Sequence, residues 1–334
     1  MKSKTKFRLS ETQIAKLVEV NFGDEGKLSS IQELKGGMFN AAYLIQRTGG
    51  LEPLVLKVSS PPETELLSYE HHLMQTEVEV YHKISAETSI PAPRVICSDF
   101  SRSLIPSDYF FMSALKGQSM HSLRRKISQN QKESLKSKLG DYFAQLHQIR
   151  GNYFGYFTDK PEYQFSSWRE AYRHMLKSIL ADGERLKVKL PYERIERVVR
   201  KQEHLLEAVN SPSLVSFDLW PGNIMLVLNG NDYEIEAIID FERSFWGDPY
   251  ADFPPAFLLF KDVREEPGFW KSYNGRLNDN KVLSSEDLKR IELYRLYIFL
   301  IMSVETYRYG FIYGKLQYHY SQQVVNNCLK SLEL

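Results

Sequence analysis

Two neighbouring segments decide the fold of this chain: Leu214-Val215-Ser216-Phe217-Asp218-Leu219-Trp220-Pro221-Gly222-Asn223-Ile224-Met225-Leu226, and then Ile238-Ile239-Asp240-Phe241-Glu242. Apolar residues flank Asp218, Asn223 and Asp240, which is typical of short buried strands. A kinase-type site needs a carboxylate for the proton of the acceptor hydroxyl, an amide oxygen five residues later for Mg²⁺, and a second carboxylate after the next strand. A hairpin with a Pro-Gly-Asn turn explains the same pattern without chemistry, so the pattern alone leaves both interpretations open.

The first part of the chain reads as three strands between residues 29 and 58, joined by glycine turns. The first turn carries Gly36 and Gly37, whose backbone can approach a phosphate, and Asn40, whose side chain adds a donor. A simple hairpin needs the same glycines, so this turn is a weak signal by itself.

Lys57 and Glu77 are two charges that the sequence predicts to be buried. Lys57 lies inside the apolar strand 54–58, and Glu77 lies on the apolar stripe of a helix from about Glu70 to Ala86. Because a buried charge is costly without a partner, we expect the two side chains to pair and to aim Lys57 at nucleotide phosphates. The alternative is an edge-strand lysine whose head reaches water.

Composition limits the class of protein. A chain of 334 residues exceeds the usual size of a single core, which predicts two lobes. Its 43 Lys and Arg nearly cancel 42 Asp and Glu, and no long basic run is present, so we expect no nucleic-acid partner. Cys97 and Cys328 lie far apart and predict neither a disulfide framework nor a zinc site.

The distribution of apolar residues predicts neither a signal peptide nor a membrane span. The segment from Phe7 to Val20 alternates polar and apolar residues, unlike a signal peptide. The most apolar stretch, Leu296 to Val304, is about half the length of a membrane span and reads as a buried helix. We therefore expect a cytoplasmic protein with no membrane partner.

With these residues in order, the chain resembles the aminoglycoside phosphotransferase family, which has a protein-kinase-like fold. The similarity extends over most of the chain and rests on the following positions: Gly36-Gly37 with Asn40, Lys57, Glu77, Ile90-Pro91-Ala92-Pro93-Arg94-Val95, Met112 to Gly117, Leu139-Gly140, Leu146-His147, Asp218 to Asn223, Asp240, Trp246-Gly247-Asp248-Pro249 and Ala251-Asp252-Phe253. Glu242 stands where a protein kinase has glycine, which argues against a protein kinase.

The resemblance implies a bilobal α+β fold. Residues 1–117 would form a nucleotide-binding lobe of mostly antiparallel sheet and a helix, with a hinge near 113–117. Residues 118–334 would form a mainly helical lobe with a small catalytic hairpin, a catalytic loop at 214–226 and a metal-binding segment at 238–242. The last helices are expected from Ser285 to Tyr309 and after Gln317.

The resemblance also implies ATP and Mg²⁺ as cofactors and gives roles to individual residues. Asp218 would be the catalytic base, and Asn223 and Asp240 would bind Mg²⁺. Lys57 would contact the ATP phosphates and Glu77 would orient it.

The match at the hinge implies that adenine lies against the backbone of Ser113 and Leu115. One departure from the family is Ser216, because the family usually has a histidine two residues before Asp218 that braces the loop. We expect the Ser216 hydroxyl to anchor a nearby backbone group instead. This change keeps a nucleotide-binding pseudokinase open as an alternative to an active kinase. A second alternative is an interaction protein without turnover, in which Asp218 and Asp240 serve only as turns and caps.

The phosphate acceptor is expected to be a small molecule with a hydroxyl group. Residues 151–212 contain eleven Lys and Arg against nine Asp and Glu, and residues 255–334 give the same totals. A polycationic aminoglycoside is held by clustered carboxylates, so this balance argues against one. The alternative is that a few well-placed acids, such as Glu242, Asp248 or Glu305, suffice to hold it. Antibiotics, sugars, amino alcohols and nucleosides remain compatible, as do a monomer and a homodimer. Tyrosines such as Tyr294 and Tyr297 recur at helical spacing and are expected to pack in the core.

Overall fold

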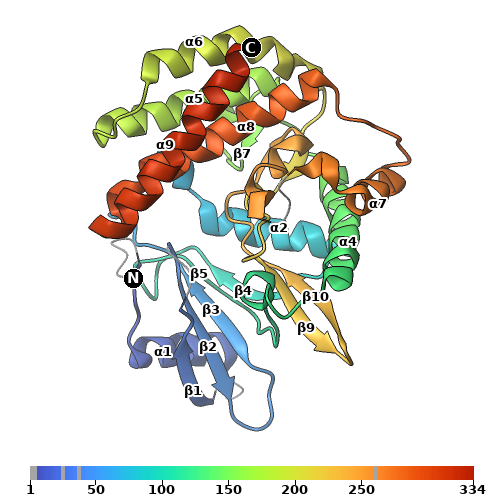
Figure 1. The fold of residues 1–334 in the computed structure, drawn as a ribbon. Helices are drawn as coiled ribbons and strands as arrows, with labels where there is room; N and C mark the ends of the chain where they lie inside the picture. Colours follow the sequence, from blue (N-terminus) through green and yellow to red (C-terminus); the bar gives the residue numbers. More distant parts are fainter. Residues whose placement is uncertain (1–5, 24–26, 36–38, 259–261) are drawn as a thin grey trace.

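The chain folds into an N-terminal sheet and a larger helical part (Figure 1). A computed structural model describes residues 6–23, 27–35, 39–258 and 262–334. This mixed α+β architecture confirms the predicted fold class. Within the described residues, no helix combines the length and apolar character that a bilayer-spanning segment requires.

Five antiparallel strands form the N-terminal sheet, in the spatial order β1 (Leu28–Glu33), β2 (Ala41–Arg47), β3 (Leu54–Val58), β5 (Tyr109–Ser113) and β4 (Val95–Asp99). Helix α1 (Glu11–Phe22) covers one face, where it shares an apolar core with Leu54, Leu56 and Val58 of β3. Strand alternation therefore turns Lys57 to the opposite face. Helix α2 (Leu73–Glu87) packs on that face, between the sheet and the helical part (Figure 1).

A hairpin lies where the N-terminal sheet meets the helical part. It consists of β9 (Ile224–Asn229) and β10 (Asp232–Ile238), and β6 (Gln118–Ser119) pairs with β9. A second small sheet has the order β7 (Gly155–Tyr156), β11 (Phe245–Gly247) and β8 (Ser213–Val215). The catalytic loop predicted from the sequence joins β8 to β9, so each of its ends is fixed by a different sheet.

The helical part surrounds these two small sheets. Its helices of eleven or more residues are α4 (Gln129–Gln148), α5 (Trp168–Arg185), α6 (Tyr192–Gln202), α7 (Pro267–Leu277), α8 (Ser285–Val304) and α9 (Phe311–Glu333). Helix α9 begins at Phe311, earlier than the expected start after Gln317. No helical period is visible there because Phe311 and Ile312 are exposed apolar residues that belong to no buried stripe.

Buried tyrosines hold α5 and α8 together. Tyr294 accepts a hydrogen bond from Trp168 Nε1 at 2.8 Å and donates one to Asp248 Oδ2 at 2.7 Å. Tyr297 packs its ring against Tyr172. Tyr294 and Tyr297 are each 1% exposed, which confirms that these tyrosines belong to the core.

Close contact between α4 and α7 predicts a stability effect at Gly140. A Cβ atom at this position would lie 2.2 Å from the Phe269 carbonyl oxygen, so the two helix backbones cannot keep their distance. We expect Gly140→Ala to lower the free energy of unfolding by about 1–3 kcal/mol in urea denaturation. Gly275→Ala in α7 is the matched control, because its Cβ meets nothing within 4 Å. It should be neutral or stabilising by up to about 1 kcal/mol, and equal effects at both sites would contradict the packing argument.

Candidate active site

Lys57 is the centre of a buried charge cluster that joins three elements. Its Nζ lies 2.6 Å from Glu77 Oε2 on α2, 2.7 Å from Asp240 Oδ1 and 3.2 Å from Glu242 Oε2. Asp240 and Glu242 directly follow β10. The pairing of Lys57 with Glu77 that the sequence predicted is present, and the structure adds the segment after β10 to it.

The cluster contains more carboxyl groups than ammonium groups. Burial alone lowers the pKa of Lys57, but the three surrounding carboxylates outweigh burial and hold that pKa well above its ordinary value. Lys57 is therefore charged, yet it offsets one of three carboxyl groups. Oxygen atoms of Glu77, Asp240 and Glu242 lie within 4.8 Å of one another. Closely spaced carboxylate oxygens are the donors that Mg²⁺ prefers, so the residues present fit this ion.

The loop from β8 to β9 brings Asp218 and Asn223 into contact. Asn223 Nδ2 donates to the Asp218 carbonyl oxygen at 3.0 Å and to Asp218 Oδ2 at 3.2 Å. Because the amide nitrogen is engaged, Oδ1 is the Asn223 atom left for a metal. The Ile239 N–H donates to the Asn223 carbonyl oxygen at 2.9 Å, which ties the loop to the residue before Asp240.

Two positions at this site have left-handed backbone conformations although neither is glycine. Phe217 has φ 58° and Asp240 has φ 69°. Such conformations cost of order 1–3 kcal/mol each and persist only where the surroundings enforce them. Phe217 precedes Asp218, so its backbone conformation sets the direction of the Asp218 side chain.

Asp252 enforces the conformation of the loop. Its Oδ1 accepts from the Phe217 N–H at 2.6 Å, and its Oδ2 accepts from the Ser216 N–H at 3.1 Å. His147 Nε2 of α4 lies 2.9 Å from Asp252 Oδ2, and its Nδ1 lies 2.9 Å from the Tyr273 hydroxyl. Since a carboxylate only accepts, Nε2 carries the proton in this arrangement.

These contacts correct the expectation for Ser216. The Ser216 hydroxyl is buried without a hydrogen-bond partner in the described part of the chain, so it anchors no backbone group. The bracing that a histidine at position 216 would supply comes from Asp252, with His147 behind it. Sequence reasoning assigned His147 no role in the site, although Leu146-His147 was among the positions that carried the resemblance.

Asn40 lies in the site with a different contact from the expected one. Its Nδ2 donates to Glu242 Oε2 at 2.6 Å, so here the side chain binds the charge cluster. The preceding turn was predicted to approach phosphate through Gly36 and Gly37, and both residues lie outside the described part of the chain.

The hinge backbone is partly engaged. The Ser113 N–H donates to the Arg94 carbonyl oxygen at 2.9 Å, so this group belongs to the sheet edge. The Leu115 N–H has no partner among the described residues. Glu236 of β10 accepts from the Lys116 N–H at 2.8 Å and the Gly117 N–H at 2.6 Å. The hinge thus presents the Leu115 N–H while Glu236 fixes the residues after it.

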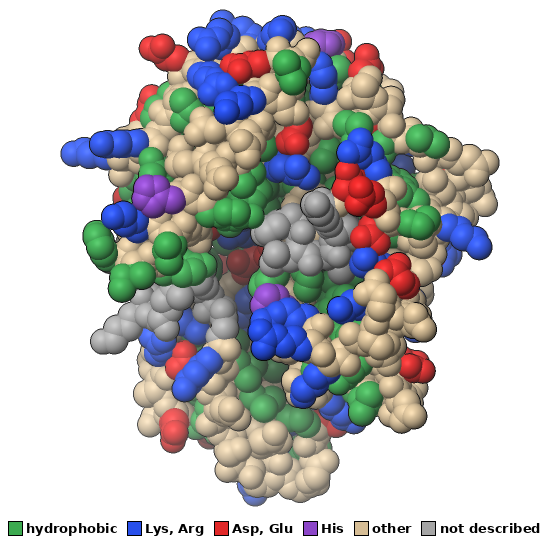
Figure 2. Space-filling model, viewed as in Figure 1, with side chains coloured by type: hydrophobic (Ala, Val, Ile, Leu, Met, Phe, Trp, Pro, Cys, Tyr) green, Lys and Arg blue, Asp and Glu red, His purple; other side chains and the backbone are tan. Residues whose placement is uncertain are grey.

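Arg243 and Glu305 form an ion pair near Asp218 that the sequence analysis did not predict. Arg243 Nη2 lies 2.7 Å from Glu305 Oε1. The pKa of Asp218 is raised to about 8: burial is the largest cause, Arg243 acts against it, and Asp240, Glu242 and Glu305 add to the rise. A carboxyl group with a pKa in this range can take up a proton near neutral pH. Figure 2 shows a hollow at mid-height of the molecule, with acidic atoms at its bottom.

The bracing of the loop predicts a large effect of Asp252→Asn. An amide at this position places a donor against the Phe217 N–H, the Ser216 N–H or His147 Nε2, and leaves at least one buried donor unpaired. We expect the free energy of unfolding to fall by about 1–3 kcal/mol in urea denaturation. Asp159→Asn, at an exposed aspartate, is the control and should change stability little. An unchanged unfolding midpoint for Asp252→Asn would contradict the bracing role.

The raised pKa of Asp218 predicts how stability depends on pH without metal and nucleotide. Between the ordinary value of 3.8 and about 8, the folded protein keeps a proton that the unfolded chain has lost, so stability falls as pH rises through this range. Asn has no such dependence. The Tm of Asp218→Asn should therefore rise relative to the Tm of the original protein between pH 5 and pH 8. Above pH 8 the difference between the two Tm values should stay constant. A constant difference in thermal melts would show an ordinary pKa at Asp218.

Comparisons with known proteins agree with this geometry. A sequence model described as the phosphotransferase enzyme family matches residues 30–278. No curated protein sequence matches the chain. Among solved structures, a thermostable variant of aminoglycoside phosphotransferase APH(4)-Ia with AMP-PNP and hygromycin B superimposes with a TM-score of 0.63 at 18% identity, covering 96% of this chain and 98% of that chain. The streptomycin-ATP complex of APH(2")-IIa gives a TM-score of 0.59 at 16% identity and covers 96% and 99% of the two chains.

The structural likenesses are below 25% identity and therefore concern the fold, which is that of aminoglycoside phosphotransferases. The sequence match covers well over half of the chain and includes Lys57, Glu77, Asp218, Asn223 and Asp240. The chain therefore belongs to the phosphotransferase enzyme family.

Proposed function

We propose that this protein is an ATP- and Mg²⁺-dependent kinase that transfers the γ-phosphate of ATP to a hydroxyl group of a small molecule. The observation that carries the proposal is the position of Lys57, whose Nζ lies within 2.7 Å of both Glu77 and Asp240. Membership of the phosphotransferase family supports the same reaction class, and the ATP and AMP-PNP complexes of the structural neighbours support ATP as the donor.

Nucleotide binding would use groups that the fold already holds in place. Lys57 would contact the phosphates, and Glu77 would keep the ammonium directed towards them. At the other end of the nucleotide, the Leu115 N–H is a donor for the edge of adenine. Both groups sit on strands or strand ends of one sheet, so their separation is fixed before ATP binds.

Phosphoryl transfer would place the acceptor hydroxyl at Asp218. The carboxylate takes the hydroxyl proton as the oxygen bonds to the γ-phosphorus, while the bond to the leaving ADP oxygen breaks. Mg²⁺, held by Asn223 and Asp240, would supply positive charge to the phosphate oxygens. Lys57 offsets charge on the same oxygens from the sheet side. Asn223 also fixes Asp218 through the hydrogen bond to its Oδ2.

The braced loop favours an active enzyme over a pseudokinase. The substitution at Ser216 removes the usual histidine, but Asp252 still binds the N–H groups of Ser216 and Phe217. Asp218 therefore keeps a fixed backbone position, and positioning is what this reaction needs most from the protein.

Removal of Asp218 separates turnover from binding. We expect Asp218→Asn to lower Mg²⁺-dependent ADP release by at least ~100-fold, because the general base is lost. Binding of Mg²⁺-ATP, followed as a thermal shift, should remain. Lys57→Met should weaken the binding itself, because the phosphates lose their cation.

Matched controls are Asp232→Asn and Lys83→Met, at an exposed aspartate and at a half-buried lysine of α2 that pairs with Glu79. Both should leave ADP release unchanged. Binding without turnover in the original protein, across a panel of hydroxyl compounds, would identify a pseudokinase. No thermal shift with Mg²⁺-ATP would identify a protein that does not bind nucleotide.

A further inference from the structure

Two buried carboxylates near the end of α8, Glu305 and Glu70, are paired with arginines. Glu305 pairs with Arg243 and also accepts from the Tyr69 hydroxyl. Glu70 binds Arg308 through two hydrogen bonds of 2.7 and 2.8 Å. Glu70, Glu305 and Arg308 are each at most 4% exposed. A buried pair of this kind is costly to break because it leaves an unpaired charge.

This charge balance argues against a polycationic acceptor. To bind Glu305 or Glu70, an ammonium group of such a compound would have to displace Arg243 or Arg308. Asp218 itself lies within the electrostatic reach of Arg243 and Glu305, whose effects oppose each other. The surroundings of the reacting hydroxyl therefore favour a compound with no charge or one charge.

Aromatic side chains lie between Glu305 and the start of α9. The Tyr309 hydroxyl donates to Glu305 Oε2 at 3.2 Å, and the Tyr309 ring meets Tyr313 edge to face with centroids 5.3 Å apart. The Arg308 guanidinium lies 5.6 Å from the centroid of Phe39, which belongs to the N-terminal part. An unbroken series of contacts thus leads from Arg243 beside Asp218 to the first turn of α9.

The first turns of α9 carry an exposed apolar surface, which we call the α9 patch: Phe311, Ile312, Tyr313 and Leu316. Phe311 is 84% exposed, Ile312 75% and Leu316 66%. Ile312 and Leu316 are four residues apart and share one side of the helix. Figure 1 places the start of α9 where the helical part faces the N-terminal sheet, and Figure 2 shows apolar side chains gathered there beside the hollow.

We propose that the acceptor is a hydroxyl compound with a broad apolar part and at most one positive charge, whose apolar part lies on the α9 patch while its hydroxyl reaches Asp218. This inference rests on the proposed kinase function. The α9 patch is linked by contacts to the candidate site, which favours a substrate over another protein as the molecule that binds there. Contact with an apolar group would also remove the apolar surface of the α9 patch from water, which is favourable.

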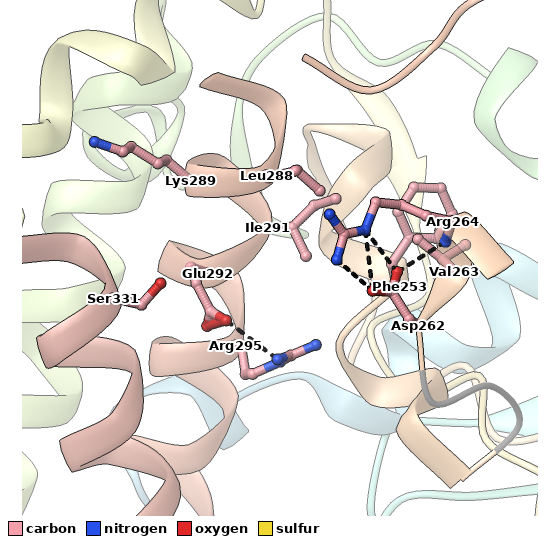
Figure 3. A pocket seen from close by; sticks show the side chains of 10 residues that line it. All are labelled: Phe253, Asp262, Val263, Arg264, Leu288, Lys289, Ile291, Glu292, Arg295 and Ser331. Carbon is pink, nitrogen blue, oxygen red and sulfur yellow. Dashed lines mark hydrogen bonds and ion pairs between the residues drawn. The ribbon is translucent and has the colours of Figure 1, made fainter. Parts of the chain in front are cut away.

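The cavity in Figure 3 offers no comparable surface. It has a volume of about 310 Å³ and lies beside α8, away from the Lys57 cluster. Arg264 pairs with Asp262, and Arg295 pairs with Glu292, so charged groups that already have partners form much of its lining. Neither Asp218 nor Lys57 lines it.

The test compares octyl and methyl β-glucoside, which share their hydroxyl groups and differ in the apolar chain, with hygromycin B as a polycationic compound. Binding is followed as a thermal shift with Mg²⁺-ADP, and turnover as ADP release with Mg²⁺-ATP, below the micelle concentration of the octyl compound. We expect octyl glucoside to bind and to change ADP release at concentrations about tenfold lower than methyl glucoside, since each buried CH₂ contributes to affinity.

The variant Ile312→Gln/Leu316→Gln should raise the octyl glucoside concentration required by about tenfold and leave the KM for ATP unchanged. Val282→Gln is the control, because Val282 is 85% exposed but lies in the connection between α7 and α8. Equal binding by the double variant, or half-saturation at a lower concentration with hygromycin B, would overturn the proposal. So would a change from dimer to monomer in light scattering of the double variant, which would make the α9 patch an interface between copies.

Failure of the kinase function has a different signature. ADP release would then be absent with every compound and unchanged by Asp218→Asn. If octyl glucoside still bound in a manner that depends on Ile312 and Leu316, the apolar contact at the α9 patch would be supported. The proposed phosphotransfer would be contradicted.

Discussion

One buried ammonium group holds the site together. Lys57 comes from the central strand of the N-terminal sheet, Glu77 from the helix on that sheet, and Asp240 and Glu242 from the segment after the hairpin. A lysine in this position is tolerated only with carboxylate partners, so the sheet and the hairpin must meet at this point. The same requirement leaves more carboxylates than one ammonium can offset. A divalent cation would complete the charge balance, so the cluster that stabilises the contact also favours metal binding.

The loop that carries Asp218 shows how a missing side chain can be compensated from elsewhere in the fold. The family's usual histidine at position 216 would act from within the loop. In this chain Asp252 binds the loop backbone from outside, and His147 of α4 and Tyr273 of α7 stand behind it. The left-handed conformation of Phe217 is then maintained by hydrogen bonds to its own N–H and to that of its neighbour. The constraint on Asp218 depends on backbone contacts, which tolerate a change of side chain at position 216.

Sequence reasoning reached the Lys57–Glu77 pair because both residues break a regular pattern, one in a strand and one in a helix. Periodicity identifies the face of an element on which a residue lies, and two buried charges on adjacent elements need each other. The contact of Asp252 with Ser216 spans 36 residues, and that with His147 spans 105. No local pattern encodes such contacts. The engagement of Asn40 by Glu242 likewise depends on how the two parts of the chain meet, which its position after two glycines does not reveal.

The start of α9 was missed for a related physical reason, and it bears on the acceptor. A helix is recognised by a stripe that packs on a core, whereas Phe311, Ile312 and Leu316 face outward. Exposed apolar residues that contribute nothing to a core, and that are linked through Tyr309 and Glu305 to Arg243, need another explanation. The paired charges of Glu70, Arg308, Glu305 and Arg243 remove the electrostatic attraction on which a polycationic substrate would rely. What the surface still offers beyond Asp218 is aromatic and aliphatic area, and recognition through such area selects substrates by shape and apolar content more than by charge.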